Sequence, residues 1–272
     1  MEDWVNLSTD FFNSYINSFK DLTEEQNKNF EIKREHSIRV AEITSWLAKT
    51  LNLAGEDRKI AFLTGLLHDI GRFNQLVEYN TFHDLKSVDH AEYSVKILKN
   101  EDILKQIGCS DYKLIYRAIQ LHNKFEIPKN ITKQELMHTR LLRDADKLDI
   151  LKVLTDYYSN KNSDPNHTLT WELPKGTRVT DSVAREILAG KLVSKKEVFS
   201  EIDVKIMQLS WVFDLNFMPS FKYLLEKRFM EKIYNSMPKN DLIIEIFRKV
   251  KVFSENKLLA YAENYSGFNI KT

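Results

Sequence analysis

Few residues in this chain can interrupt a helix, and this scarcity constrains the fold more than any other feature. The 272 residues include only seven glycines and five prolines, and such a composition favours long helices. Apolar residues also recur at the spacing of a helical face, as in residues 4–20, 29–53 and 132–158. We therefore predict an all-α fold.

The predicted helices form two groups on either side of one long connection. An N-terminal packing helix in residues 1–28 leads into a helical domain at 29–158, and a helical lobe occupies 181–272. Between them, residues 159–180 contain two prolines and a glycine, which are typical of a loop. The C-terminal lobe has aromatic packing residues and few convergent polar groups. We assign it a structural role, with homo-oligomerisation as a further option.

Shorter segments carry more specific expectations. Residues 73–89 are polar and aromatic and predict a loop at a pocket mouth. Ser87 is the expected N-cap of a helix that follows and ends near Lys99. Residues 167–171 permit a weakly signalled strand pair. Helices are predicted in the lobe at 181–189, 203–213, 220–236 and 241–262.

Charge and composition exclude several classes of protein. The net charge is +1, from 40 basic and 39 acidic residues, so the bulk charge indicates neither a nucleic-acid nor a membrane partner. The single cysteine, Cys109, rules out a disulfide framework and a thiolate zinc site within one chain. No signal peptide is evident, and no apolar run approaches the roughly 18 residues that a membrane span needs. We therefore expect a cytoplasmic protein. The glycines form no dinucleotide-binding fingerprint and no P-loop.

An adjacent histidine and aspartate, His68-Asp69, follow an apolar run and precede Gly71. Neighbouring positions within a helix point about 100° apart, but at a helix end both side chains can turn toward one cation. A carboxylate buried in this setting needs a partner charge or a metal ion, because an unpaired buried charge is too costly. The pair therefore predicts further ligands elsewhere in the chain.

Side chains of suitable chemistry lie near the apolar face of other predicted helices. Each histidine taken singly is more often structural, but together the candidates come from five successive helical segments: His36, His68-Asp69, His90, His122 and Asp146. Four ligands suffice for one divalent cation, with positions left for water or substrate, and two further histidines suit a second ion. Imidazole and carboxylate donors without thiolate favour Mn, Fe, Co, Ni or Zn over Mg or Ca.

The last ligand has an alternative. Asp146 falls between Leu142 and Ile150 at i, i+4 spacing, and so leans toward the apolar side of its helix. Asp144 lies two residues earlier, about 200° away around the helix, so only one of the two aspartates can face a common site. We prefer Asp146 and keep Asp144 as the alternative.

The order His36, His68-Asp69, Asp146 resembles that of the HD-domain metal-dependent phosphohydrolase superfamily. The stretch His68-Asp69-Ile70-Gly71-Arg72 is similar to the second motif of that family. Ala145-Asp146-Lys147-Leu148 is similar to its terminal motif, whose aspartate is a metal ligand. The resemblance covers roughly residues 30–155. It implies an HD-domain helical bundle with an additional C-terminal helical lobe.

The resemblance also implies a ligand set. Four residues are expected to bind the first metal ion: His36, His68, Asp69 and Asp146. His90 and His122 occupy the places where binuclear members, such as cyclic-dinucleotide phosphodiesterases, carry additional ligands. The Gly-Tyr-Pro element of one such subgroup is missing, so that substrate class is not implied. The expected cofactor is one or two divalent transition-metal ions.

The implied reaction is hydrolysis of a phosphate ester by metal-activated water, with Asp69 as a catalytic residue. A bound cation lowers the pKa of water and neutralises charge on a phosphoryl oxygen. Lys147 and Arg72 are the cations best placed in sequence to contact the substrate phosphate, although each can instead pair with a neighbouring aspartate. Three loop residues are further candidates for protonating the leaving oxygen: Glu78, His83 and Asp84. His138 and His167 match no motif and are interpreted as ordinary.

The leading hypothesis is a hydrolase that cleaves a phosphomonoester or phosphodiester, with a nucleotide as the favoured small-molecule substrate. One alternative is a di-iron oxygenase, because some HD-fold proteins with the same six ligands oxidise C–H or C–P substrates. The other is a non-catalytic nucleotide or metal sensor that signals through the C-terminal lobe. The presence of both ligand sets and of a polar loop argues against the sensor.

Overall fold

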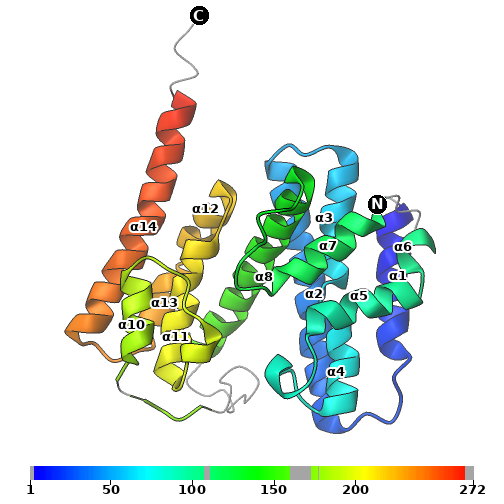
Figure 1. Cartoon of the computed structure of the whole chain (residues 1–272), viewed down its shortest axis with the longest axis horizontal. Coiled ribbons are helices and arrows are strands. Elements are labelled where there is room, and N and C mark those ends of the chain that lie inside the picture. Colours follow the sequence, from blue (N-terminus) through cyan, green and yellow to red (C-terminus); the bar gives the residue numbers. More distant parts are fainter. Residues whose placement is uncertain (1–2, 107–110, 160–172, 177, 267–272) are drawn as a thin grey trace, which may run out of the picture. The chain divides into compact units, whose positions relative to one another are not determined.

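The computed structural model is helical in its described part and has no strand there, which confirms the all-α prediction (Figure 1). The described residues are 3–106, 111–159, 173–176 and 178–266. The chain divides into two compact units, Met1–Asp149 and Ile150–Thr272. The boundary falls within the long helix α8 (Lys133–Ser159). The predicted strand pair at 167–171 lies outside the described residues.

The first unit contains helices α1 to α7 and the start of α8. Their bounds are α1 (Asp3–Asn17), α2 (Glu24–Thr50), α3 (Gly55–Leu67), α4 (Gly71–Tyr79), the 3-10 turn η1 (Asp84–Lys86), α5 (His90–Asn100), α6 (Ile103–Gln106) and α7 (Tyr112–His122). Helix α2 begins at Glu24 rather than at Asn29, because Thr23 and Gln26 form a capping box. Each donates its backbone N–H to the other's side-chain oxygen at 3.1 Å.

Helices α2 and α3 pack closely against each other, and this contact positions the site. A Cβ placed on Gly65 of α3 would meet Ala41 Cα of α2 at 2.7 Å and Thr44 Oγ1 at 2.6 Å. Apolar side chains that are at most 1% exposed contribute to the core of these two helices: Leu47, Ile60, Leu63, Leu66 and Leu67. The close approach brings the end of α3, where His68 lies, against His36 of α2, with ring centroids 5.2 Å apart.

The prediction of a loop at 73–89 is wrong for its first part, because residues 71–79 form α4. Phe73 and Leu76 are buried on one side of this helix, and Gln75 between them is fully buried as well. The Gln75 amide donates hydrogen bonds to Ser87 Oγ at 2.8 Å and to Val88 O at 3.0 Å. Because buried Gln75 is polar, the apolar residues of this segment do not show the full helical pattern, and hydrophobicity alone does not predict the helix.

Helix α5 is capped by Asp89 and not by Ser87 as predicted. Asp89 Oδ1 accepts hydrogen bonds from the backbone N–H groups of Ala91 and Glu92, at 3.0 and 3.3 Å. Ser87 Oγ instead accepts from Gln75. This cap makes His90 the first residue of α5.

Gly71 allows the start of α4 to approach the start of α5. A Cβ at this position would lie 2.8 Å from His90 O and 2.6 Å from Ser94 N. The Gly71 N–H donates to Ser94 Oγ at 2.9 Å. The glycine that follows the His-Asp pair is therefore needed to bring His90 beside Asp69.

The second unit continues from α8 with helices α10 (Asp181–Leu188), α11 (Glu201–Ser210), α12 (Met218–Glu226), α13 (Phe229–Asn235) and α14 (Asp241–Ser266), and with the 3-10 turns η2 (Lys195–Glu197) and η3 (Trp211–Asp214). Aromatic pairs tie α14 to its neighbours, with ring centroids of Phe213 and Phe253 4.8 Å apart. The prediction of one helix at 220–236 is wrong, because Arg228 adopts a left-handed φ of 55° and separates α12 from α13. No described helix is long and apolar enough to cross a membrane.

Candidate metal centre

All six predicted ligands lie in the first unit. His36 is on α2, His68 and Asp69 follow α3, His90 begins α5, His122 ends α7, and Asp146 lies on α8. The four histidines and Asp69 are at most 5% exposed, whereas the Asp146 side chain is 19% exposed. The structure therefore gathers these residues into a largely buried cluster.

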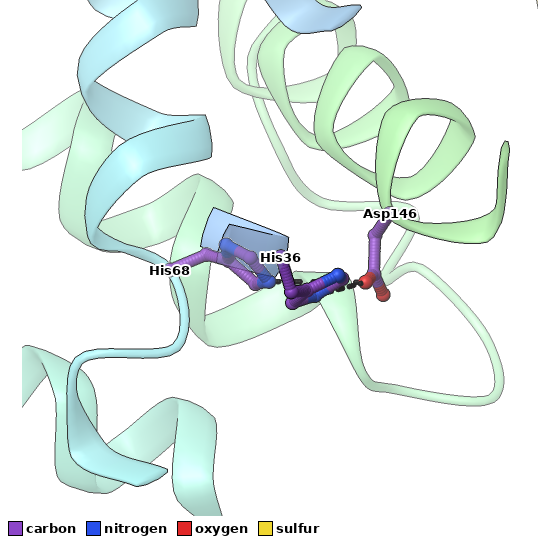
Figure 2. Close-up of side chains that lie close together, drawn as sticks. All are labelled: His36, His68 and Asp146. Carbon is purple, nitrogen blue, oxygen red and sulfur yellow. Dashed lines mark ion pairs between the residues drawn. The ribbon is translucent and has the colours of Figure 1, made fainter. Parts of the chain in front are cut away.

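His36, His68 and Asp146 converge from three helices on one point (Figure 2). Asp146 Oδ1 lies 3.2 Å from His36 Nε2 and 3.8 Å from His68 Nε2. Asp69 Oδ2 lies 3.7 Å from each of the same two nitrogens. We call these four residues the first site.

The other carboxylate oxygen of Asp69 faces a second pair of histidines. Asp69 Oδ1 lies 3.5 Å from His90 Nε2, and His90 Nε2 lies 3.1 Å from His122 Nε2. We call Asp69, His90 and His122 the second site. The two sites adjoin, because the rings of His68 and His122 meet edge to face with centroids 5.1 Å apart, and they share Asp69.

In each of the four imidazoles, the Nδ1 atom is hydrogen-bonded to an oxygen acceptor. The pairs are His36 with Asp149 Oδ2 (2.7 Å), His68 with Gly65 O (2.8 Å), His90 with Asp84 Oδ2 (2.6 Å) and His122 with Ile119 O (2.6 Å). Because these oxygens accept hydrogen bonds, Nδ1 carries the proton in each ring and Nε2 presents a lone pair. Anchoring of the outer ring nitrogen is the usual support of a histidine that binds metal.

The cluster fits a divalent cation. His36 Nε2 and His68 Nε2 are buried without a hydrogen-bond partner in the described part of the chain, and buried polar atoms are seldom left so. Two atoms that each lie about 2.1 Å from one ion, at about 90–110°, are about 3.0–3.4 Å apart. The pairs His90–His122 and His36–Asp146, at 3.1 and 3.2 Å, match this spacing.

The electrostatics of the cluster favour the protonation states that metal binding needs. Burial lowers the pKa of His68 and of His90, and burial together with the neighbouring imidazoles lowers that of His122 further. Burial opposes ionisation of Asp69, but Lys33 and the nearby histidines outweigh it and hold the pKa well below the ordinary value. At neutral pH these histidines are neutral and the carboxylate is charged, as ligands must be.

His36 behaves differently from the other histidines. Burial and the charge of Lys33 lower its pKa, but the carboxylates of Asp146 and Asp149 outweigh both and raise it. In turn, His36 holds the pKa of Asp146 below its ordinary value in spite of burial. Protonation of His36, which these carboxylates favour, therefore competes with a cation for the Nε2 lone pair at the first site.

The sequence reading missed the role of Asp149. Its carboxylate is fully buried, and it accepts hydrogen bonds from His36 Nδ1 and from Arg39 Nε, the latter at 2.6 Å. Asp149 lies three residues after Asp146 on α8, and residues at this spacing share a helix face. That spacing was the signal that could have identified it.

Asp149→Ala is expected to weaken metal binding by about 10- to 100-fold, since removing a partner that orients a ligating histidine has effects of this size. The measurement is the Kd for Mn²⁺ by isothermal titration calorimetry. Asp156→Ala serves as the control, because Asp156 is an exposed residue of the same helix that pairs with Lys152. Equal Kd values for Asp149→Ala and the unsubstituted chain would show that Asp149 does not support the site.

Arg72 and Asp84 form a network beside the second site. Arg72 Nη1 donates hydrogen bonds to Asp84 Oδ1 at 2.8 Å, to Gln75 Oε1 at 2.8 Å and to Phe82 O at 2.6 Å. The other oxygen of Asp84 accepts from His90 Nδ1. Asp84 therefore orients His90, and Arg72 holds Asp84 in place.

Lys33 is a second residue that sequence reasoning missed. Its Nζ atom lies 2.8 Å from Asp69 Oδ2. Lys33 precedes His36 by three residues on α2, so both side chains lie on the same face of the helix. This cation is a direct neighbour of the residue that the two sites share.

The remaining candidates lie in varied surroundings. Asp144 is fully buried but is not among the residues whose oxygen or nitrogen atoms gather at the two sites. Lys147 is partly buried on α8. Glu78 accepts a hydrogen bond from Tyr93, and His83 is exposed.

His138 Nε2 pairs with Asp57 Oδ1 of α3 at 2.9 Å, as expected for a structural histidine; His167 lies outside the described residues.

Comparison with known protein families finds a match for the part of the chain that contains the candidate metal centre. The family model described as HD domain matches residues 34–154, a range that contains all six predicted ligands. Neither the curated proteins nor the solved structures include a significant match. The match over residues 34–154 confirms the resemblance of this segment to the HD domain.

Proposed function

We propose that the chain is a metal-dependent phosphohydrolase that cleaves a phosphomonoester or phosphodiester of a nucleotide. The observation that carries this proposal is the anchoring of all four Nδ1 atoms, which leaves four Nε2 lone pairs directed at one buried cluster. The HD-domain match supports the same class of reaction. A cytoplasmic location and homo-oligomerisation through residues 181–272 stay predictions from sequence.

The proposed ligand arrangement is binuclear. His36, His68 and Asp146 would hold one ion with Asp69 Oδ2, and His90 and His122 would hold the other with Asp69 Oδ1. Asp69 is the only one of the six with a separate oxygen facing each site among the described contacts. Elemental analysis is expected to find about two transition-metal ions per chain, which is the arrangement used to clamp phosphoryl oxygens.

The chain's own residues divide the remaining tasks. When bound, the cations supply a nucleophilic water at neutral pH and neutralise charge on the phosphoryl group. Asp69, shared between the sites, fixes their separation, while Asp149 and Asp84 fix the orientation of His36 and His90. Arg72 and Lys147 stay the predicted contacts to the substrate phosphate.

The test is turnover by metal-depleted protein that is reloaded with Mn²⁺ or Co²⁺ under anaerobic conditions. The substrates are p-nitrophenyl phosphate, bis-p-nitrophenyl phosphate, nucleoside monophosphates and cyclic nucleotides. We expect metal-dependent hydrolysis of at least one, and its loss with EDTA. Absence of hydrolysis together with iron-dependent O₂ consumption would instead establish the oxygenase. Nucleotide binding without any turnover would establish the sensor.

A further inference from the structure

A lysine ammonium lies directly beside the candidate metal centre. Lys33 Nζ is 2.8 Å from Asp69 Oδ2, the oxygen that also faces His36 Nε2 and His68 Nε2 at 3.7 Å each. A divalent ion in the first site would therefore have this ammonium as a close neighbour. Two cations are held side by side only where anionic groups compensate them, and Asp69 is one such group.

Lys33 is also the most accessible of the side chains that pair with Asp69 in the described part of the chain. Its side chain is 17% exposed, compared with 12% for Arg72, 6% for His36 and none for His68. Asp146, at 19%, is the exposed ligand of the first site. Lys33 and Asp146 are therefore the most exposed of these side chains around the first site, and we take this side as the approach for a substrate.

Lys33 and Arg72 both face Asp69 but differ in what else they hold; Arg72 Nε lies 3.5 Å from Asp69 Oδ1, without a hydrogen bond in the described part of the chain. Arg72 Nη1 is shared among three acceptors and so holds Asp84 against His90. In the described residues, the Lys33 ammonium makes one hydrogen bond, to Asp69, and an ammonium has three N–H donors. Two donors of Lys33 are left for a ligand at the first site.

Phe82 limits the positions that the Lys33 ammonium can take. Lys33 Nζ lies 5.6 Å from the centroid of the Phe82 ring, and Arg72 Cζ lies 5.9 Å from the same centroid. Contact of a cation with an aromatic face is attractive. Together with the hydrogen bond to Asp69, it positions the ammonium before any ligand arrives, which reduces the entropy cost of binding.

We propose that Lys33 binds a non-bridging phosphoryl oxygen of the substrate beside the metal centre. The inference rests on the proposed function, because it requires a phosphate group at the first site. A lysine is a compact point charge that suits a phosphoryl oxygen. The hydrogen bond to Asp69 persists in the complex, since a carboxylate oxygen can accept a hydrogen bond and bind a cation at the same time.

The test measures phosphate binding and metal content separately. Inorganic phosphate is titrated into Mn²⁺-loaded protein by calorimetry for the unsubstituted chain, Lys33→Met and Lys33→Arg, and bound metal is measured for each. Lys59→Met is the matched control, because Lys59 also lies over an aromatic ring, at 5.8 Å from the centroid of Trp4, and none of its described contacts is with a proposed ligand.

We expect Lys33→Met to retain its metal and to bind phosphate about 10- to 100-fold more weakly, which is the usual effect of losing a charge-assisted hydrogen bond. Lys33→Arg should recover most of the affinity, and Lys59→Met should match the unsubstituted chain. KM for a hydrolysed ester should rise in Lys33→Met by a similar factor.

Two results would overturn this role of Lys33 while the proposed function stands. One is unchanged phosphate affinity in a metal-loaded Lys33→Met variant. The other is loss of metal from that variant, which would make Lys33 a structural partner of Asp69. If the unsubstituted, metal-loaded chain neither binds phosphate nor hydrolyses any ester, the proposed function itself fails.

Discussion

Asp69→Asn is expected to remove most of the bound metal and to lower turnover by at least about 1,000-fold, equivalent to about 4 kcal/mol of transition-state stabilisation. The physical reason is that Asp69 presents one carboxylate oxygen to the first site and the other to the second. Asparagine has nearly the same size but is neutral and has only one oxygen. It can neither compensate two cations nor bridge them.

Metal content and turnover are measured on the same preparations of Asp69→Asn. Asp57→Asn is the matched control, because Asp57 also pairs with a histidine, His138, but contacts none of the predicted ligands in the described structure. We expect this control to keep both metal and activity. Loss of metal from Asp69→Asn with undiminished turnover would contradict catalysis by the metal centre.

Gly65→Ala is expected to destabilise the first unit by about 1–2 kcal/mol net, because overpacking of a close contact costs up to about 3 kcal/mol. The new methyl group would lie 2.7 Å from Ala41 Cα and 2.9 Å from Ala41 N. These are backbone atoms of α2, so the contact cannot be relieved by rotating a side chain. The better helix propensity of alanine, about 1 kcal/mol, offsets only part of this cost.

The effect of Gly65→Ala should extend to the metal centre. Gly65 O accepts the hydrogen bond of His68 Nδ1 at 2.8 Å, and separation of α2 from α3 would move His68 away from His36. We therefore expect a lower midpoint in urea unfolding, followed by circular dichroism, and weaker Mn²⁺ binding by the fraction that is still folded.

Gly55→Ala is the control for this prediction. Gly55 begins the same helix, and a Cβ placed there meets no atom within 4 Å. Alanine at this position should leave the midpoint unchanged or raise it slightly, because it restricts the unfolded chain. Equal midpoints for Gly65→Ala and Gly55→Ala would contradict the close approach of α2 and α3.

The sequence by itself determined the fold class and the resemblance to the HD domain. Helix-breaking residues are scarce, apolar residues recur at helical spacing, and two short motifs surround His68-Asp69 and Asp146. Each of these signals is local, because a helix forms its hydrogen bonds within four residues and shows one face to the core. Helical periodicity also identified the six candidate ligands, because each is a histidine or aspartate near the apolar face of its predicted helix. Metal binding by these residues stays a prediction.

Local signals failed where a residue's environment comes from another segment. Gln75 is polar in sequence, but Ser87 and Val88 satisfy its amide in the core, so α4 was predicted as a loop. The break at Arg228 likewise could not be predicted, because no glycine or proline marks it. A buried polar side chain whose hydrogen-bond partners lie in another segment does not contribute to the apolar periodicity of its own helix.

Only the tertiary structure decided which side chains support the centre. Asp149 meets His36 across 113 residues, and Lys33 meets Asp69 across 36. In sequence, Lys33 and Asp149 are ordinary charges in charged helices, where most such groups are solvated. Their roles depend on the packing of helices that are distant in sequence, which places Asp149 of α8 beside His36 and Lys33 of α2 beside Asp69.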